Sequence, residues 1–451
     1  MNNLKKQILS VAVATSTVLS CVPVSMAAIP ADVQGTRYEE PVQILSALNI
    51  MVGDENGAYR LDDTIIRSEV AKMAIHALGL EDAAESSKGQ TMFDDVSAEH
   101  WANGYINLAV SQGIIEGDGD GNFRPNAPIS YAEAMTIMVR ATGYTVSAEE
   151  NGGYPHGYMK TGTSNGLAKN VQGSYSDKIS RGNVAYLTTN ALESKLMEQT
   201  GFGSDGKYEI TEKTLLKDKL KVTKDTGRIT AIENTSLTGS SSLAKGQIKI
   251  DNKTYETAYN MNNLLGYNVT YYVKNEGKND ESVILAMPIQ NQNNDLTISS
   301  ELFSKLTTKN GNTAIEYFKD ENTSKTNTAE ISSDATLIYN GKYQAMDKNL
   351  IDLTDKSGNI TLLDSNKNGK YDIVFVKNYE NIVVDTVSST GKIVDKYSQK
   401  VLKLDDTVDF RITKGLEEIS VSDLAEYDVL SVAASLDKEL YEVEVTNKTV
   451  E

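Results

Sequence analysis

Side chains that commonly do catalytic or metal chemistry are scarce in this sequence. It has three histidines and one cysteine in 451 residues, and the histidines share no metal-ligand spacing. Residues 162–166 (GTSNG) match the nucleophile-elbow pattern by letter, but no buried strand precedes them, as that motif requires. Residues 201–207 fit a phosphate-loop pattern, but Tyr208 stands where a serine or threonine must reach magnesium. We therefore expect no enzymatic activity.

One stretch carries oxygen side chains of the kind that calcium prefers. In DSNKNGKYD (364–372), oxygens come from Asp364, Asn366, Asn368 and Asp372, with a glycine at the sharp turn, as in the first nine positions of an EF-hand loop. The acid expected at position twelve is replaced by phenylalanine, and the flanking runs ITLL and IVFV are typical of strands. We therefore favour an Asn-Gly hairpin and keep calcium as the only cofactor candidate.

Two arginines stand where an anion could bind. Arg67 and Arg181 lie in the segments IIRSE (65–69) and ISRGN (179–183), each in the first turn of a predicted helix. Unpaired backbone N–H groups favour negative charge there, and a guanidinium group can hold a carboxylate through two hydrogen bonds. An isolated arginine at such a place is more often a solvated or surface-paired charge, so the assignment depends on the surrounding elements.

Those elements form a helical unit that recurs along the first third of the chain. Gly53 and Gly117 lie twelve residues before the isoleucines that open IIRSE and ISYAE (129–133), and Gly79 and Gly143 close the two helices at equal distances. Serine and glutamate in S-x-x-E form a capping box in the second copy, and ISRGN opens a third copy. One unit cannot bury its apolar stripe alone, so we expect three to pack together.

The second copy carries a specific resemblance. The stretch 93–135 resembles an S-layer homology domain over several spaced motifs. These are Phe93-Asp94, Trp101-Ala102, Tyr105-Ile106, Gly113-Ile114-Ile115-x-Gly117, Phe123-x-Pro125 and a variant of the family's ITRAE motif. The flanking copies match less fully, since the first lacks the Trp-Ala pair and the third has a curtailed loop.

The resemblance implies a three-copy, pseudo-threefold helical domain whose grooves hold a secondary polysaccharide of a Gram-positive-type wall, commonly bearing pyruvate carboxylates. Arg67 and Arg181 match the motif arginine, and Tyr131 replaces it in the middle copy. Trp101 is either a core aromatic or a platform on which a sugar ring stacks. The polysaccharide-binding residues expected from the resemblance are thus Arg67, Arg181, Trp101 and Tyr131.

Beyond residue 207 the hydrophobic period changes from helical to alternating, as in YNVTYYVK (267–274) and KYDIVFVK (370–377). Short strands separated by Asn, Asp and Gly predict sandwich- or barrel-like domains, loosely similar to the β-rich parts of clostridial-type surface-layer proteins. The predicted fold class is a multidomain chain with an all-α repeat domain followed by β-rich domains. The predicted segments are a signal peptide (1–27), three repeats (28–90, 91–145 and 146–198), a linker (199–207) and two β-rich domains (208–295 and 296–451).

The amino terminus and the composition indicate export. Two lysines, an apolar run and the small-x-small site Ser25-Met26-Ala27 predict a secretory signal peptide, although a lipoprotein signal ending at Cys21 is the alternative. With 62 Asp+Glu against 44 Lys+Arg, the formal net charge is -18. Such a chain is a poor general binder of nucleic acid or anionic membrane, so we expect neither partner after signal cleavage.

The sequence therefore predicts a secreted structural protein of the cell wall or S-layer. Its repeats would bind secondary wall polysaccharide without a covalent bond, and its β-rich body would form or join a surface lattice by self-association. The first alternative is an anchored wall or polysaccharide hydrolase with an unrecognised active site. The second alternative is an adhesin that presents its β domains to another surface.

Overall fold

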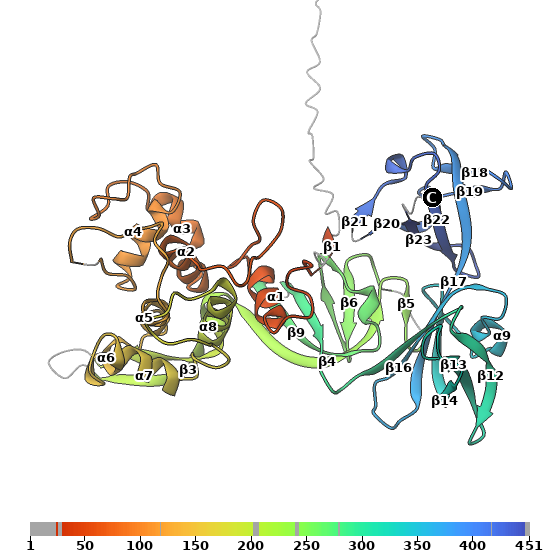
Figure 1. Ribbon diagram of the computed structural model, residues 1–451, viewed down its shortest axis with the longest axis horizontal. Helices are drawn as coiled ribbons and strands as arrows, with labels where there is room; N and C mark the ends of the chain where they lie inside the picture. Colours follow the sequence, from red (N-terminus) through yellow and green to blue (C-terminus); the bar gives the residue numbers. More distant parts are fainter. Residues whose placement is uncertain are drawn as a thin grey trace, which may run out of the picture.

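The molecule is elongated, with a helical head at one end and a β-rich body at the other (Figure 1). The computed structural model describes residues 24–25, 29–117, 119–201, 207–239, 243–277, 280–415 and 417–446. The predicted signal peptide thus lies outside the described residues, except for β1 (Val24–Ser25), which pairs in parallel with β8 (Tyr259–Asn260). In the described part of the chain, no helix has the length and apolar character needed to cross a membrane.

Among the residues that the structure describes, eight short helices build the head. They are α1 (Glu39–Ala47), α2 (Arg67–Ala77), α3 (Glu81–Ser86), α4 (Asn103–Ser111), α5 (Tyr131–Ala141), α6 (Thr145–Glu150), α7 (His156–Ser164) and α8 (Arg181–Glu193). The capping box predicted for α5 is present, because the Ser130 hydroxyl accepts from the Glu133 N–H and the Glu133 carboxylate accepts from the Ser130 N–H. Helices α2, α5 and α8 contact one another at the centre of the head, and they pack mainly on the outer helices α4, α7 and α1, respectively.

The three central helices are joined at their starts by a ring of backbone hydrogen bonds. Ile65 donates its N–H to the carbonyl of Ile179, Ile179 to Ile129 and Ile129 to Ile65, at 3.1–3.2 Å. The residues just before each helix are extended, so their backbone groups have no helical partner and must be paired elsewhere inside the head. For these three isoleucines, the partners come from the other two copies.

The predicted fold class is wrong in describing the repeat region as all-α. Isolated β-bridges link the copies at Thr64–Ser180, Ile66–Pro128 and Ser130–Lys178. A hairpin of β2 (Lys195–Gln199) and β3 (Tyr208–Thr214) also joins the head. Over the described residues, strands outweigh helices, because the β-rich body is the larger part of the chain.

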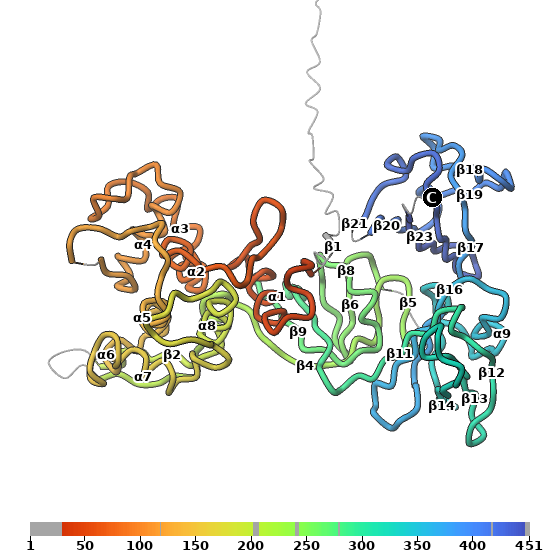
Figure 2. The backbone as a smooth tube through the Cα atoms, in the orientation of Figure 1, coloured from red at the N-terminus to blue at the C-terminus, as the bar shows by residue number. Residues whose placement is uncertain are grey.

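The head and the body share one hydrophobic core. After β3, a π-helical turn, η1 (Leu215–Lys219), places Leu215 and Leu216 among the buried side chains of the head, together with Tyr272 and Leu285 from the body. The β2–β3 hairpin returns to the head, where the Met197 N–H donates to the Thr142 carbonyl at 3.1 Å. The predicted boundary at residue 208 therefore runs through a continuous core, and Figure 2 shows β4 leading from it into the body.

The first part of the body is a closed barrel. Its elements are β4 (Val222–Ile232), β5 (Thr235–Ser236), β6 (Gln247–Ile250), β7 (Lys253–Glu256), β8, η2 (Asn262–Leu264), β9 (Asn268–Gly277) and β10 (Asp280–Pro288). Pairing runs from β4 to β6, β7, β10 and β9, and β9 pairs with β4 again. Of these five pairs only β7–β10 is parallel, and buried isoleucine, valine and tyrosine side chains fill the interior.

The remaining strands form one continuous 13-stranded sheet around two further cores. The second barrel has β11 (Asn294–Ser299), β12 (Phe303–Lys309), β13 (Asn312–Phe318), β14 (Thr326–Tyr339), β15 (Lys342–Gln344), α9 (Lys348–Ile351), β16 (Ser357–Asp364) and β17 (Tyr371–Val387). The third has the end of β17, β18 (Lys392–Asp395), β19 (Val401–Lys403), β20 (Asp409–Lys414), β21 (Glu417–Ile419), η3 (Val421–Asp423), β22 (Val429–Ala434) and β23 (Leu440–Thr446).

All three barrels have the same topology. In each barrel, the first strand pairs with both the second and the fourth strand. The third and fifth strands pair in parallel, and a short helical turn lies between the third and fourth strands. The first strand of the second barrel is split into β11 and β12, and the third strand of the third barrel is split into β19 and β20. This order is that of the OB fold. The predicted segment 296–451 thus holds two barrels, joined because β17 is the fifth strand of one and the first strand of the next.

The shared core predicts that head and first barrel lose stability together. Leu215 is fully buried, so Leu215→Ala leaves a cavity that costs about 2–5 kcal/mol in the free energy of unfolding. We expect hydrogen exchange to accelerate to a similar extent in peptides from α8 and from β9. Ile210→Ala, in the exposed part of the adjoining strand β3, is the matched control and should change neither. Faster exchange confined to the head would contradict a shared core.

Candidate functional site

The two predicted arginines lie between copies of the repeat and are buried, each only 8 % exposed. Arg67, at the start of α2, donates from Nε to the Phe123 carbonyl at 2.8 Å and from Nη1 to a Glu133 carboxylate oxygen at 2.5 Å. Arg181, at the start of α8, makes the same pair of contacts with the Tyr59 carbonyl, at 2.8 Å, and with Glu69, at 2.6 Å. Each guanidinium group therefore links its own copy to the next one.

The glutamates serve two purposes at once. Glu133 accepts the Ser130 N–H at its own helix start and also pairs with Arg67 of the preceding copy. Burial alone would raise the pKa of Glu133, but the hydrogen bonds from Ser130 and the charge of Arg67 outweigh burial and lower it. Glu69 likewise accepts the N–H of Ile66 and pairs with Arg181. Both carboxylates are therefore part of the head's framework.

The third interface has no such ion pair, because Tyr131 stands at the arginine position and Asn183 at the glutamate position. Tyr131 is 5 % exposed and contributes to the core of the head, and its burial raises the pKa of its hydroxyl. The side chain of Asn183 bonds instead to the Ser180 hydroxyl and to the Gln172 N–H. For Arg67, Arg181 and Tyr131, direct contact with a polysaccharide stays a prediction.

Exposed aromatic rings lie at the starts of two outer helices. Trp101, just before α4, is 48 % exposed, and its ring stacks on that of His100 with centroids 5.8 Å apart. Tyr154, just before α7, is 58 % exposed. A large ring with an apolar face and a polar edge is suited to stacking on a sugar. The alternative that Trp101 is a core aromatic is not what the structure shows.

Tyr154 is a candidate that sequence reasoning missed. Trp101 and Tyr154 each lie three residues before a glycine, Gly104 or Gly157, which is the second residue of its helix. A Cβ on either glycine would come within 1.9 or 2.1 Å of a neighbouring backbone carbonyl, so only glycine fits. This shared spacing aligns the two rings, and it is the sequence signal that could have identified Tyr154.

The predicted calcium ligands make contacts within the protein. Asp364, at the end of β16, accepts the backbone N–H groups of Asn368 and Gly369, and Asp372 is held by Ser365 and by Arg228 of the first barrel. Asn366 and Asn368 likewise accept N–H groups of the turn. Within the described ranges, no group of three or more His, Cys, Asp or Glu side chains is arranged to hold a metal. The favoured hairpin is present, since β16 and β17 are antiparallel, and the calcium site stays a prediction.

The ion pairs predict that Arg67 is essential to the stability of the head. Arg67→Ala leaves Glu133 partly buried without its cation, which costs about 2–4 kcal/mol in the free energy of unfolding. The double variant Arg67→Met/Glu133→Gln removes both charges but keeps an acceptor for the Ser130 N–H, so it should recover at least half of that loss. Urea denaturation followed by circular dichroism measures both. Lys88→Ala, at an exposed ion pair with Glu85, is the control and should change stability by less than about 1 kcal/mol. Equal effects of Arg67→Ala and Lys88→Ala would contradict the structural role.

Two of the predicted repeats match a known protein family. The model of the S-layer homology domain matches residues 31–71 and 93–135. These two segments contain α1 and the first turn of α2, and α4 and the first turn of α5. The third predicted copy lies outside the matched segments and stays a prediction, although α8 takes part in the backbone ring on equal terms.

Three similar proteins are named as wall or surface proteins of bacteria. The chain is 29% identical over 314 residues to a middle cell wall protein of Brevibacillus brevis, with 62% of this chain and 30% of that protein covered. It is 28% identical over 313 residues to a surface layer protein of Brevibacillus choshinensis, with 62% and 28% covered. It is 28% identical over 441 residues to a cell surface protein of Thermoanaerobacter kivui, with 95% and 52% covered.

The chain spans about half the length of these relatives or less. All three are named as wall or surface proteins, and none is named as an enzyme. Together, the family match and the relatives show that this chain carries S-layer homology domains and is related to S-layer and cell-surface proteins.

Proposed function

We propose that the head holds this protein on the cell wall by binding secondary wall polysaccharide without a covalent bond. The observation that carries the proposal is the S-layer homology match over residues 31–71 and 93–135, which contain the ion-paired Arg67 and Glu133 and the exposed side chain of Trp101. The ion pairs keep the copies in register, and the exposed rings of Trp101 and Tyr154 supply the sugar-contacting surface. Binding energy then comes mainly from stacking and local hydrogen bonds.

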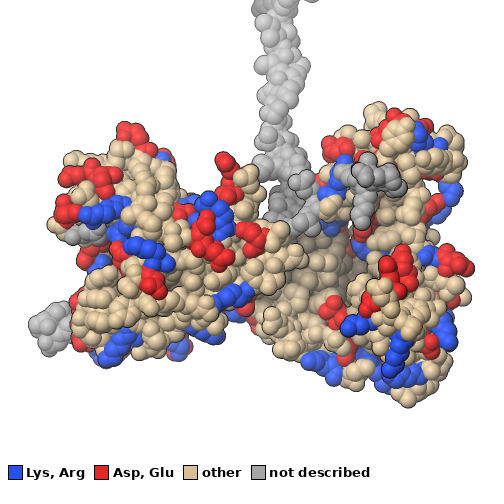
Figure 3. Space-filling model, viewed as in Figure 1, with Lys and Arg blue, Asp and Glu red and all other residues tan. Residues whose placement is uncertain are grey.

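Electrostatics favours this division of roles. The chain carries a formal charge of -18, so an anionic polymer gains no long-range attraction. On the face shown in Figure 3, acidic and basic side chains are interspersed over head and body. At physiological salt, exposed charges more than about 8 Å apart are largely screened, which lets short-range contacts decide the affinity. A ring face needs no opposite charge to bind a sugar.

The body is proposed to be a surface structural module, exported with the head and able to assemble into a lattice. Three barrels follow one another, two of them share a strand, and the first is fused to the head through a common core. Because the head and the first barrel share one hydrophobic core, anchoring the head also fixes the position of the body. The surface and wall relatives, which match along the body as well as the head, support the proposal.

Sedimentation with purified walls tests the anchoring role. We expect the full chain to sediment with walls, and to stay in solution when the non-peptidoglycan polymer has been stripped from them. The double variant Trp101→Ala/Tyr154→Ala should bind at least tenfold more weakly, because it removes both exposed ring faces while leaving the core intact.

A matched control distinguishes the loss of exposed aromatic side chains from the head from their loss elsewhere in the protein. Tyr397→Ala/Tyr427→Ala removes two exposed rings from the third barrel and should sediment like the unmodified chain. Thermal unfolding by circular dichroism establishes that all variants are folded. Undiminished sedimentation of the head variant would reject these rings as the contact surface, and sedimentation that survives stripping would reject the polysaccharide as the ligand.

A further inference from the structure

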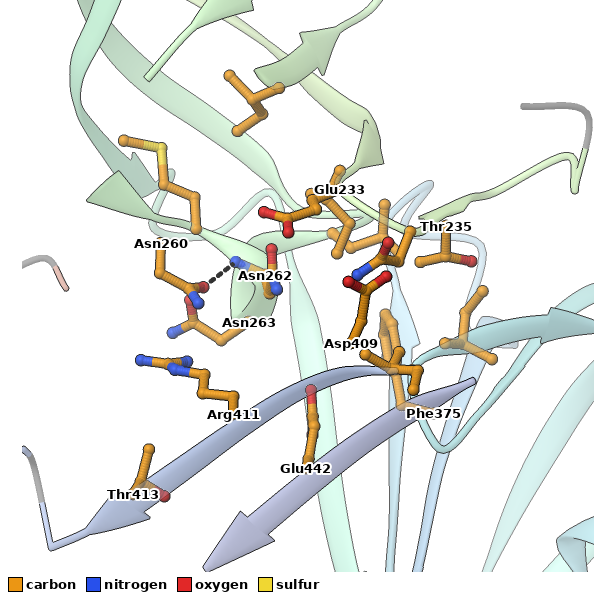
Figure 4. A pocket seen from close by; sticks show the side chains of 18 of the residues that line it. Glu233, Thr235, Asn260, Asn262, Asn263, Phe375, Asp409, Arg411, Thr413 and Glu442 are labelled. Carbon is orange, nitrogen blue, oxygen red and sulfur yellow. Dashed lines mark hydrogen bonds between the residues drawn. The ribbon is translucent and has the colours of Figure 1, made fainter. Parts of the chain in front are cut away.

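A cavity of about 380 Å³ lies where the three barrels meet, outside the head. Its walls come from the loop after β4 and the segment after β7 in the first barrel, from β17, and from β20 and β23 in the third barrel. Figure 4 shows side chains from these elements pointing into a common space. The volume is within the range of small-ligand sites, about 300–1,000 Å³.

The wall from the first barrel is rich in amides. Asn260, Asn262 and Asn263 follow one another around the short turn η2, and the Asn262 N–H donates to the side chain of Asn260 at 2.9 Å. This bond turns the run back on itself, and the three amides face Arg411 across the cavity (Figure 4). The side chain of Asn263 makes no hydrogen bond with any other described residue, so its donors and acceptor are free for a ligand.

The wall from the third barrel is charged because of strand alternation. Ile412 and Val443 point into the core of that barrel, so Asp409, Arg411 and Glu442 on the same two strands point outward to the cavity. Arg411 pairs through Nε with Glu418 at 2.9 Å, which fixes the guanidinium plane and leaves its other N–H groups toward the amides. The carboxylate of Asp409 accepts no hydrogen bond from the described part of the chain.

Glu233, from the loop after β4, closes the cavity from the opposite side (Figure 4). Burial raises the pKa of Glu233, the charge of Lys245 opposes the rise, and the charge of Asp409 adds to it. The ring of Phe375, on β17, lies among the lining residues and packs against the core of the first barrel. The cavity therefore combines amide and guanidinium donors, carboxylate acceptors and an aromatic ring.

These groups select a class of ligand. Lys377 and Arg411 also line the cavity, but Lys377 is paired with Glu442 at 3.1 Å and Arg411 with Glu418. A phosphate or another multiply charged anion would therefore meet the carboxylates of Glu233 and Asp409 at close range. An apolar ligand would leave the amides and carboxylates dehydrated without partners. A sugar hydroxyl is both a donor and an acceptor, so it can satisfy an amide and a carboxylate at once while its ring contacts an aromatic face. In the OB fold, moreover, the loop between the first two strands helps to bind oligosaccharides, and here that loop carries Glu233.

We infer that the cavity at the junction of the three barrels is a binding site for a short neutral saccharide, with Asn263, Asp409 and Arg411 making the principal hydrogen bonds. The site is separate from the wall-binding surface proposed for the head. It would let the body hold a glycan while the head holds the wall.

Soluble disaccharides provide the test on the full chain. Isothermal titration calorimetry and saturation-transfer NMR with N,N′-diacetylchitobiose, cellobiose and maltose should show saturable binding of at least one of them. Asn263→Ala/Asp409→Ala should weaken that binding at least tenfold. Both side chains are exposed, so the variant should keep the thermal unfolding midpoint of the unmodified chain.

Asn252→Ala/Asp406→Ala is the matched control, since both residues are exposed, lie in turns of the same two barrels and do not line the cavity. It should bind like the unmodified chain. Failure of all three disaccharides to bind, or equal binding by the cavity variant and the control, would overturn the inference. Sedimentation with walls should be unaffected by Asn263→Ala/Asp409→Ala, while Trp101→Ala/Tyr154→Ala should keep disaccharide binding, so the failure of either proposal is distinguishable from failure of the other.

Discussion

The head depends on a ring of backbone hydrogen bonds that no single copy of the repeat can make. The extended residues before α2, α5 and α8 have N–H and carbonyl groups that are buried and outside any helix, and Ile65, Ile129 and Ile179 satisfy them in a cycle. Because leaving such groups unpaired costs as much as losing a hydrogen bond, one copy or two would expose unpaired backbone. The ring also fixes where each helix begins, and it therefore places the ion pairs and the exposed rings of the outer helices.

The barrels of the body are also held together by shared elements. β17 closes the second barrel and opens the third, so neither barrel can move away without breaking a strand in its middle. Asn340 reinforces this junction, because its buried side chain accepts the Asn378 N–H and donates to the carbonyls of Asn378 and Ala434. The pair Arg228–Asp372 adds a link from the first barrel to the second. The cavity at the junction is consequently enclosed by parts held in fixed relation.

The sequence predicts local features of this molecule better than its long-range pairings. Helical spacing and the Ser130–Glu133 capping box located α5 correctly, because both are set within one turn of chain. The barrels were not predicted one by one, since their closure depends on parallel pairing of strands far apart, such as β14 with β17. The arginines were interpreted singly because their glutamate partners lie 66 and 112 residues away.

The loss of charge at one interface argues that the ion pairs are structural. At two interfaces an arginine meets a glutamate of another copy, and at the third both are absent together, replaced by Tyr131 and Asn183. Replacing only one partner would strand a partly buried charge and destabilise the head, whereas replacing both leaves a neutral interface that can be filled by a buried ring. A residue selected only for contact with an external anion would have no reason to disappear together with a glutamate of another copy. The paired replacement is the pattern expected when each arginine's first partner is inside the protein.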